Sequence, residues 1–309
     1  MAREFNILHA PSPLGLKPPA EGRVPGVRQM PEALRRAGLH AVFGSGTYDT
    51  VQPPEYAPDL DSELRVRNPR AIAHYSVELA NAVEPRLNGQ AFSIVLGGDC
   101  SILIGTALAM RRVGRFGVIY IDAHSDCQSP EVSQTGGVAG MPLAIATGRG
   151  PRILSDLESR RPYLADEDVI LLGLRDLFDV VGTDKKTIAG TQIRVRDLED
   201  VRSSTADRVA RDALASLTGT GVDAVWVHLD VDVLNPEIMP AVDSPDPGGL
   251  SPVELTALLR PLLAAPIVSG MQITIYDPER DPDGQAAKVL VDILSRSLQS
   301  YDEEVGVEQ

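Results

Sequence analysis

Residues 117–126 read Gly-Val-Ile-Tyr-Ile-Asp-Ala-His-Ser-Asp, an apolar run followed by three potential metal ligands. The β-branched and aromatic residues of 117–121 predict a buried strand. Asp122, His124 and Asp126 follow at alternate positions, and alternate residues of an extended segment point to the same side. We therefore expect these three side chains to share one face at the end of the strand.

A second stretch farther along the chain repeats this design. Residues 224–229 (Ala-Val-Trp-Val-His-Leu) also predict a buried strand, and Asp230 and Asp232 follow it at alternate positions. Carboxylates a few ångströms apart cannot all remain ionised unless a cation lies between them. If the two strand ends meet, their carboxylates therefore predict a site for divalent metal ions.

Segments with strand and helix patterns alternate along the whole chain. The predicted strands cover residues 5–10, 92–96, 117–121, 169–173, 224–229 and 267–276. The predicted helices cover residues 31–38, 70–87, 102–112, 207–217, 252–263 and 285–298. This alternation predicts an α/β fold with three layers, α/β/α, around a mostly parallel, doubly wound sheet.

Other segments are predicted to be loops, caps or ends. Residues 44–69 are rich in Pro and Asp and predict irregular structure, and residues 128–142 predict a loop at the mouth of the site. Ser251 and Glu254 have the spacing of a capping box before a helix. Because no internal boundary or repeat is visible, we interpret residues 1–309 as a single domain, whose acidic tail 300–309 is a frayed end.

The composition narrows the classes of function. With 43% hydrophobic and 23% charged residues, the chain has the composition of an ordinary globular protein. A net charge of -14 argues against nucleic acid and against an anionic membrane surface as partners. The sequence has only two cysteines and shows no signal peptide or long apolar span. These features predict a cytoplasmic protein.

Three segments together resemble the metal signatures of the arginase/agmatinase, or ureohydrolase, family. They are Gly-Gly-Asp-Cys-Ser at 97–101, Asp-Ala-His-Ser-Asp at 122–126 and Asp-Val-Asp-Val-Leu-Asn-Pro at 230–236, in the order of the family. The resemblance covers nearly the whole chain. It implies a three-layer fold with a two-metal, usually manganese, centre, where a metal-bridging hydroxide cleaves a guanidinium-type C–N bond. It also implies a homo-oligomer, either a trimer or a hexamer.

The resemblance implies a role for each ligand. Asp122 and Asp230 would bridge the two ions, Cys100 and Asp126 would complete the first site, and His124 and Asp232 would complete the second. Asp126 would in addition act as the general acid/base that passes a proton to the leaving amine.

Among the residues at the predicted site, Cys100 departs from the family, and His228 needs a separate interpretation. The family has His where this chain has Cys100, and a thiolate suits Zn, Fe, Co or Ni as well as Mn. The metal identity is therefore left open, with manganese as the expected ion. His228 alternates onto the side of the site, but the family has no ligand there. We expect it to be a hydrogen-bonded core residue that supports the site.

The substrate side departs further from the family. Ala139 stands where arginases have a His for proton traffic, and Ile275 where the family has a Glu that clamps the guanidinium. We expect Asp277, which has the strand parity of Ile275, to replace this clamp as a catalytic and substrate-binding residue, with Glu131 and Glu279 as alternatives.

Contacts to the rest of the substrate are implied for Gln128, Ser133 and Thr135. Phe178 replaces the Asp with which arginases hold the amino group of their substrate. The expected substrate is thus a guanidino or amidino small molecule other than L-arginine. The alternative is a catalytically weakened or inactive family member that binds metal or ligand in a regulatory or structural role. The intact set of ionisable groups favours the enzyme.

Overall fold

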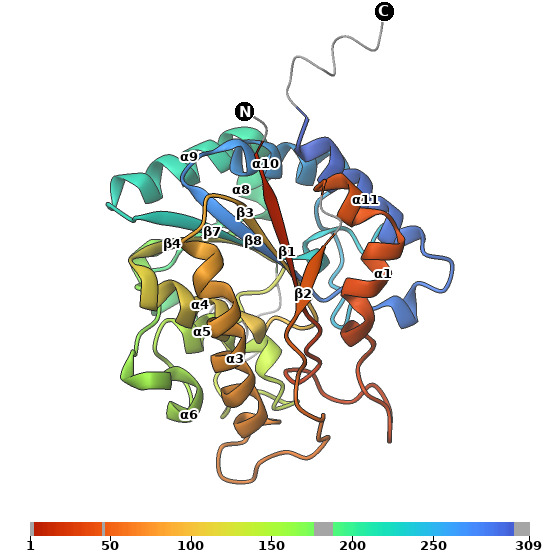
Figure 1. Cartoon of the computed structure of the whole chain (residues 1–309), viewed down its shortest axis with the longest axis vertical. Coiled ribbons are helices and arrows are strands. Elements are labelled where there is room, and N and C mark those ends of the chain that lie inside the picture. Colours follow the sequence, from red (N-terminus) through yellow and green to blue (C-terminus); the bar gives the residue numbers. More distant parts are fainter. Residues whose placement is uncertain (1–2, 45–46, 176–187, 300–309) are drawn as a thin grey trace, which may run out of the picture.

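A single eight-stranded sheet organises the protein, as seen in a computed structural model that describes residues 3–44, 47–175 and 188–299 (Figure 1). The strand order is β2-β1-β3-β8-β7-β4-β5-β6, and every neighbouring pair is parallel. The strands are β1 (Phe5–Ala10), β2 (Tyr48–Thr50), β3 (Phe92–Gly97), β4 (Phe116–Ile121), β5 (Val169–Leu174), β6 (Arg194–Asp197), β7 (Ala224–Asp230) and β8 (Val268–Thr274).

Helices cover both faces of the sheet, so the predicted three-layer α/β/α fold is confirmed (Figure 1). One face carries α3 (Pro69–Leu87), α4 (Ile102–Val113), α5 (Pro142–Ala146) and α6 (Arg152–Ser155). The other carries α1 (Met30–Arg36), α2 (Leu39–Val42), α8 (Leu198–Ser203), α9 (Ala206–Gly219), α10 (Pro252–Ala264) and α11 (Gln285–Ser297). Short 3-10 helices are η1 (Gly26–Gln29), η2 (Val138–Gly140), η3 (Leu157–Ser159), η4 (Asp166–Asp168), η5 (Val231–Val233) and η6 (Pro278–Arg280).

Burial on both faces explains the uninterrupted apolar runs of the central strands. In β4, Val118 and Tyr120 pack into the core beneath α3 and α4. Ile119 and Ile121 pack into the opposite core, beneath α9 and α10. A strand covered on both faces needs apolar residues at every position, not only at alternate ones. The polar residues that follow such a strand therefore mark the point where it leaves the core.

The structure differs from the sequence prediction at both edges of the sheet and at the end of the last strand. The segment 44–69, predicted to be irregular, contains the edge strand β2, whose three residues are all exposed. The other edge strand, β6, and the helix α8 that follows it were not predicted, because the Arg-Val-Arg-Asp sequence of β6 has little apolar character. At both edges, backbone pairing with a central neighbour forms the strand. The last strand, β8, ends at Thr274 and not at residue 276.

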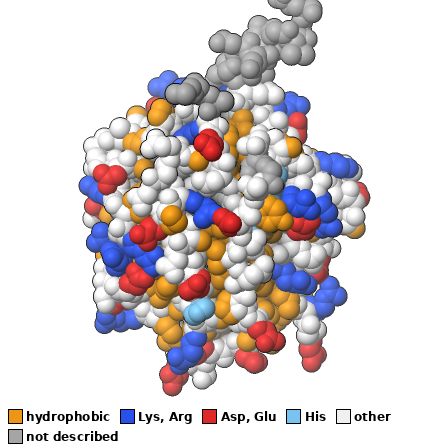
Figure 2. Space-filling view, in the orientation of Figure 1, with side chains coloured by type: hydrophobic (Ala, Val, Ile, Leu, Met, Phe, Trp, Pro, Cys, Tyr) orange, Lys and Arg blue, Asp and Glu red, His pale blue; other side chains and the backbone are white. Residues whose placement is uncertain are grey.

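The predicted capping box is confirmed at the start of α10. Glu254 N–H donates to Ser251 Oγ at 3.2 Å, and Ser251 N–H donates to Glu254 Oε2 at 2.7 Å. Among the described helices, none is both long enough and apolar enough to cross a membrane. On the face shown in Figure 2, basic and acidic side chains are interspersed. This face therefore offers no concentrated positive charge of the kind that phosphate backbones bind.

Candidate metal centre

The three motifs meet because the strands before them lie together in the middle of the sheet. The consecutive strands β3, β8, β7 and β4 all end at the same edge, where parallel sheets bind ligands. After β3, Gly98 passes so close to the preceding loop that a Cβ atom would lie 1.9 Å from Ser12 O. Asp99 fixes this turn, since it accepts from Gly15 N at 2.9 Å and from Ser101 N at 2.8 Å. Cys100 is thereby directed toward β7.

The first group of potential ligands is completely buried. Its ligand atoms, from Cys100, Asp122, His228 and Asp230, all lie within 4.8 Å of one another. Cys100 Sγ donates to Asp230 Oδ2 at 2.9 Å. Burial and the nearby carboxylates raise the pKa of Cys100 well above its ordinary value. Burial, with the charges of Asp232 and Asp122, also raises the pKa of Asp230.

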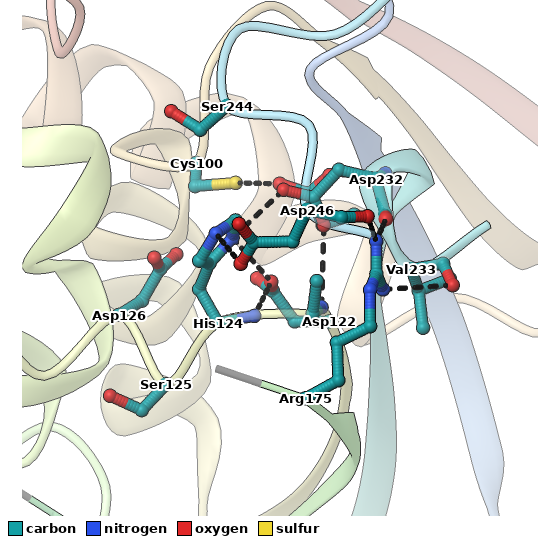
Figure 3. Close-up of polar contacts among 12 residues, drawn as sticks. Cys100, Asp122, His124, Ser125, Asp126, Arg175, Asp232, Val233, Ser244 and Asp246 are labelled. Carbon is teal, nitrogen blue, oxygen red and sulfur yellow. Dashed lines mark hydrogen bonds and ion pairs between the residues drawn. The ribbon is translucent and has the colours of Figure 1, made fainter. Parts of the chain in front are cut away.

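The second group consists of Asp122, His124 and Asp232. His124 Nδ1 lies 2.9 Å from Asp232 Oδ2 and 3.7 Å from Asp122 Oδ1, and its Nε2 lies 3.2 Å from Asp246 Oδ2 (Figure 3). Burial by itself lowers the pKa of His124, but the carboxylates around it, Asp232 above all, raise that pKa well above its ordinary value. The imidazole is therefore held at both nitrogens.

Asp122 belongs to both groups, and within the part of the chain that the structure describes its buried carboxylate lacks a full set of hydrogen-bond partners, which a cation could replace. Among the described residues, no hydrogen-bond donor reaches the buried Asp122 Oδ2. Burial and the charge of Asp232 raise the pKa of Asp122 to about 7. Carboxylate oxygens, an imidazole and a thiol together form a donor set suited to divalent transition metals. The residues present therefore fit a metal centre in which Asp122 is shared.

The third motif is held in place by a buried guanidinium, a role that the sequence analysis did not foresee. Arg175 follows β5 and donates to four backbone carbonyl groups at 2.6–3.3 Å (Figure 3). Three of these carbonyls belong to residues 232–234 and the fourth to Asp246. The only sequence signal was a charged residue directly after a buried strand. Asp246, between two prolines, gave no signal at all.

Asp126 is placed differently from the other predicted ligands. Because β4 ends at Ile121 and Asp126 has φ +51°, the expectation that residues 122–126 continue as an extended strand is wrong. Among the described residues, Asp126 is in neither of the two ligand groups. It is buried, its charge acts on Cys100, and its Oδ2 accepts from Tyr120 Oη at 2.6 Å. Figure 3 shows it on the side of His124 away from Asp232.

The strand-parity argument for Asp277 is also wrong. β8 has already ended, and Ile275 has φ +77°, a left-handed conformation that is strained for a β-branched residue. Asp277 instead begins the 3-10 helix η6, where its Oδ1 accepts from Glu279 N at 2.9 Å and its Oδ2 lies 3.6 Å from Arg280 Nε. Burial raises the pKa of Asp277, and the charges of Glu279 and Asp243 add to this effect. Asp277 therefore lies in a turn after the end of β8, within the electrostatic influence of two other carboxylates.

The remaining predicted substrate contacts lie in the loop after the second motif. Ser133 Oγ accepts from Gly136 N and Thr135 Oγ1 from Gly137 N, both at 3.1 Å, so each hydroxyl caps its own turn. Gln128 is half-buried and pairs through its backbone N–H with Gly140 O at 3.0 Å. Glu131 is exposed and Ala139 is buried. Phe178 lies outside the described residues.

Comparisons with known proteins agree with this geometry. A family model described as "Arginase family" matches residues 16–299. The curated arginase of Bacillus caldovelox is 32% identical over 276 residues, covering 87% of this chain and 91% of the relative. The arginase of Staphylococcus aureus (strain COL) is 30% identical over 302 residues, covering 94% and 96%.

Solved structures give the same result. The crystal structure of arginase from Bacillus caldovelox superimposes with a TM-score of 0.85 at 29% identity, covering 97% of this chain and 99% of that one. A formimidoylglutamase from Bacillus subtilis shares the fold alone, with a TM-score of 0.74 at 18% identity, covering 96% of this chain and 86% of that one. The chain therefore belongs to the arginase family, whose members are metal-dependent hydrolases of C–N bonds in amidino and guanidino compounds.

Proposed function

We propose that this protein is a dinuclear metal-dependent hydrolase that cleaves a C–N bond of a small guanidino or amidino compound other than L-arginine. The observation that carries the proposal is the pair of buried ligand groups that share Asp122. A carboxylate shared between two groups of ligands can hold two metal ions side by side, as a two-metal hydrolytic centre needs. The buried negative charges have little reason to lie together in the absence of cations.

The proposed ligand set follows the family resemblance. The first ion would be held by Cys100, Asp122, Asp126 and Asp230, and the second by Asp122, His124, Asp230 and Asp232. Two divalent ions in these positions would supply an activated water nucleophile near neutral pH. Manganese is the expected metal, and the Cys100 sulfur makes Zn, Fe, Co or Ni alternatives.

Asp126 is proposed to hold and transfer the proton that the leaving amine requires. The hydrogen bond from Tyr120 Oη, at 2.6 Å, orients the carboxylate of Asp126. Its backbone carbonyl accepts from Leu143 N at 3.1 Å and from Ala144 N at 3.3 Å, which ties the turn to the start of α5. A carboxylate held in this way can exchange a proton without losing its position.

The cationic head of the substrate is proposed to bind between carboxylates on the substrate side. Asp277 and Asp243 act on each other electrostatically, and a guanidinium or amidinium group would relieve this repulsion. Ile275 offers no charge at the position where the family resemblance places a Glu. Gln128, Ser133 and Thr135 remain the proposed contacts for the rest of the molecule. These differences support a substrate other than L-arginine.

The domain organisation, cellular location, oligomeric state and partners of the enzyme are also proposals. We keep a single domain spanning residues 1–309 and a cytoplasmic location as inferences from the sequence, and a homo-oligomer, trimer or hexamer, as an inference from the family resemblance. Neither nucleic acid nor membrane is proposed as a partner.

The test is a substrate screen on metal-loaded protein. Apoprotein is reconstituted with Mn, Zn, Fe, Co or Ni, and release of urea and ammonia is measured with arginine, agmatine, guanidinobutyrate, guanidinopropionate, formiminoglutamate and guanidine. We expect turnover on one of the compounds other than arginine, with two ions bound per chain. Asp126→Asn is the matched control, since it should abolish turnover with less effect on metal content.

Two outcomes would decide against the proposal. Rapid hydrolysis of L-arginine would show that the protein is an arginase despite Ile275. Two bound ions with no turnover on any compound would support the alternative of an inactive, metal-binding family member, which the departures at Ala139 and Ile275 favour.

A further inference from the structure

A row of buried polar side chains crosses three strands beneath Cys100, and neither the ligand set nor the substrate side explains it. His228 of β7 pairs in register with Gln272 of β8, and Asp230 pairs in register with Thr274. His228, Gln272 and Thr274 have no exposed surface. The ring of His228 stacks on that of Tyr120 with centroids 4.0 Å apart and planes 2° apart, which fixes the orientation of the imidazole.

The direction of hydrogen bonding in this row is set at one end by a tryptophan. Trp226 Nε1–H can only donate, and it donates to Gln272 Oε1 at 3.2 Å. Thr106 Oγ1 also donates to Gln272 Oε1, at 2.6 Å. The oxygen of the Gln272 amide is thus assigned, and the amide nitrogen donates to His228 Nδ1 at 2.7 Å. Since Nδ1 accepts, the neutral imidazole of His228 carries its proton on Nε2.

The direction at the other end is set by the thiol. The single proton of Cys100 goes to Asp230 Oδ2 at 2.9 Å, so the sulfur is an acceptor toward Thr274 Oγ1 at 3.1 Å. The hydroxyl of Thr274 has the carbonyl of Leu229 as its other acceptor, at the longer distance of 3.3 Å. The oxygen of Thr274 is in turn the acceptor nearest to His228 Nε2, at 3.5 Å. The contacts at the thiol end are thus compatible with the direction that Trp226 sets.

We infer that a directed hydrogen-bond chain, Trp226 to Gln272 to His228 to Thr274 to Cys100, makes His228 a fixed N–H donor and a positioning residue for the Cys100 sulfur. His228 is a member of the first group of potential ligands, but its Nε2 presents a proton and not a lone pair. Cys100 would hold a divalent ion as the thiolate, with its proton lost to solvent. The hydroxyl of Thr274 would donate to that thiolate. The inference rests on the proposed function only in taking Cys100 as a ligand.

The first test measures the proton on His228 directly, in metal-free protein. Nitrogen-15 NMR of the imidazole is expected to show a protonated Nε2 and a bare Nδ1, with the signals assigned by their loss in His228→Gln. The variant Gln272→Glu replaces the donor to Nδ1 by an acceptor of the same shape, so the proton should move to Nδ1. A proton on Nδ1 in the parent protein would overturn the inference. With Zn²⁺ added, loss of the Nε2–H signal would overturn it as well, because His228 would then be a ligand.

The second test uses bound Co²⁺ as a spectroscopic probe of the Cys100 sulfur. Co²⁺-loaded protein is expected to show a sulfur-to-metal charge-transfer band. Thr274→Val removes the last donor at nearly constant shape, and should shift this band to lower energy and weaken Co²⁺ binding by about tenfold to a hundredfold. Thr274→Ser, which restores the hydroxyl, should return both to the parent values. An unchanged band and affinity in Thr274→Val would overturn the role given to the chain.

Each of the two tests can give a negative result independently of the other. A parent protein without the sulfur–cobalt band would show that Cys100 is not a ligand, which contradicts the proposed ligand set and the sulfur end of the chain. The proton position of His228 in metal-free protein would still decide the remainder of the chain, whatever the enzyme hydrolyses.

Discussion

The two sides of the candidate site are held in different ways. The ligand cluster, defined as Cys100, Asp122, His124, Asp230 and Asp232, is linked across strands by contacts such as Cys100 to Asp230 and His124 to Asp232. The substrate side, defined as residues 128–137 and 275–281, has no such side-chain links to the ligand cluster among the described residues and is held by its own turns and by backbone contacts to neighbouring loops, such as Asp277 N to Ala241 O at 2.8 Å. Thr135 and Asp277, for example, each accept from a backbone N–H two residues later.

This difference has a consequence for specificity. Removal of one member of the ligand cluster leaves another buried polar group without its partner, so losses at these positions are costly. A change in the largely exposed stretch 131–135 of the substrate side disturbs only a turn at the surface, and loops tolerate such changes. A family member can therefore keep its hydrolytic centre while it changes its substrate. Four predictions test the contrast between the two sides.

The largest effect is expected at the shared carboxylate. Asp122→Asn removes a ligand atom from both groups, so most of the bound metal should be lost. Turnover should fall by far more than the 10–100-fold that follows loss of a residue outside the ligand shell. Asp230→Asn should behave alike. Metal content per chain and initial rates measure the effect, and two retained ions in either variant would contradict the assignment.

An intermediate effect is expected at Asp246, which holds the outer nitrogen of His124 at 3.2 Å. Asp246→Asn keeps the shape of the side chain and removes its charge, so His124 should bind metal less tightly. Affinity for the second ion should fall by about 10–100-fold. Metal titration measures this change, with the exposed Glu237→Gln of the same segment as control. Equal affinities in the two variants would mean that Asp246 does not orient His124.

On the substrate side, a smaller and pH-dependent effect is expected. A cationic substrate needs the ionised form of Asp277, and burial raises the pKa of this carboxyl above its ordinary value. As the pH falls, the parent should therefore lose kcat/KM at a higher pH than an ordinary carboxyl of pKa about 3.9 allows. Asp277→Asn should lack this acid limb and lower kcat/KM by about tenfold, as expected for a lost hydrogen bond to a charged group.

Metal content separates this effect from the first two. Asp277→Asn should bind the same two ions as the parent, and the exposed Asp283→Asn serves as the matched control. Loss of metal from Asp277→Asn would show that the two sides are not independent.

The smallest effect on activity is expected from a change in stability alone. Ser251→Ala removes the side-chain cap of α10. It should lower the free energy of unfolding by about 1 kcal/mol. Metal content and KM should stay at parental values, which denaturant unfolding and steady-state kinetics can check together. A change in KM would mean that the loop before α10 responds to the stability of the helix.

The order of residues was sufficient for the fold class, the central strands and the meeting of Cys100, Asp122, His124, Asp230 and Asp232 at one edge of the sheet. Each of these depends on local information. An apolar run predicts a doubly covered strand, and the ends of neighbouring parallel strands meet at one edge. The Cys100 segment and residues 122–124 come directly after β3 and β4, and Asp230 is the last residue of β7, so their meeting place follows from the strands.

The parts of the site that the sequence did not predict depend on contacts between segments that are distant in the chain. Asp246 reaches His124, and Arg175 reaches the backbone of residues 232–234, only because two loops cross over the sheet edge. Gln272 meets His228 only through the register of β7 and β8. The parity argument for Asp277 failed because Ile275 has a positive φ, which no local pattern of a β-branched residue indicates. Register and loop paths arise from packing over the whole molecule, and a local pattern of residue types does not contain them.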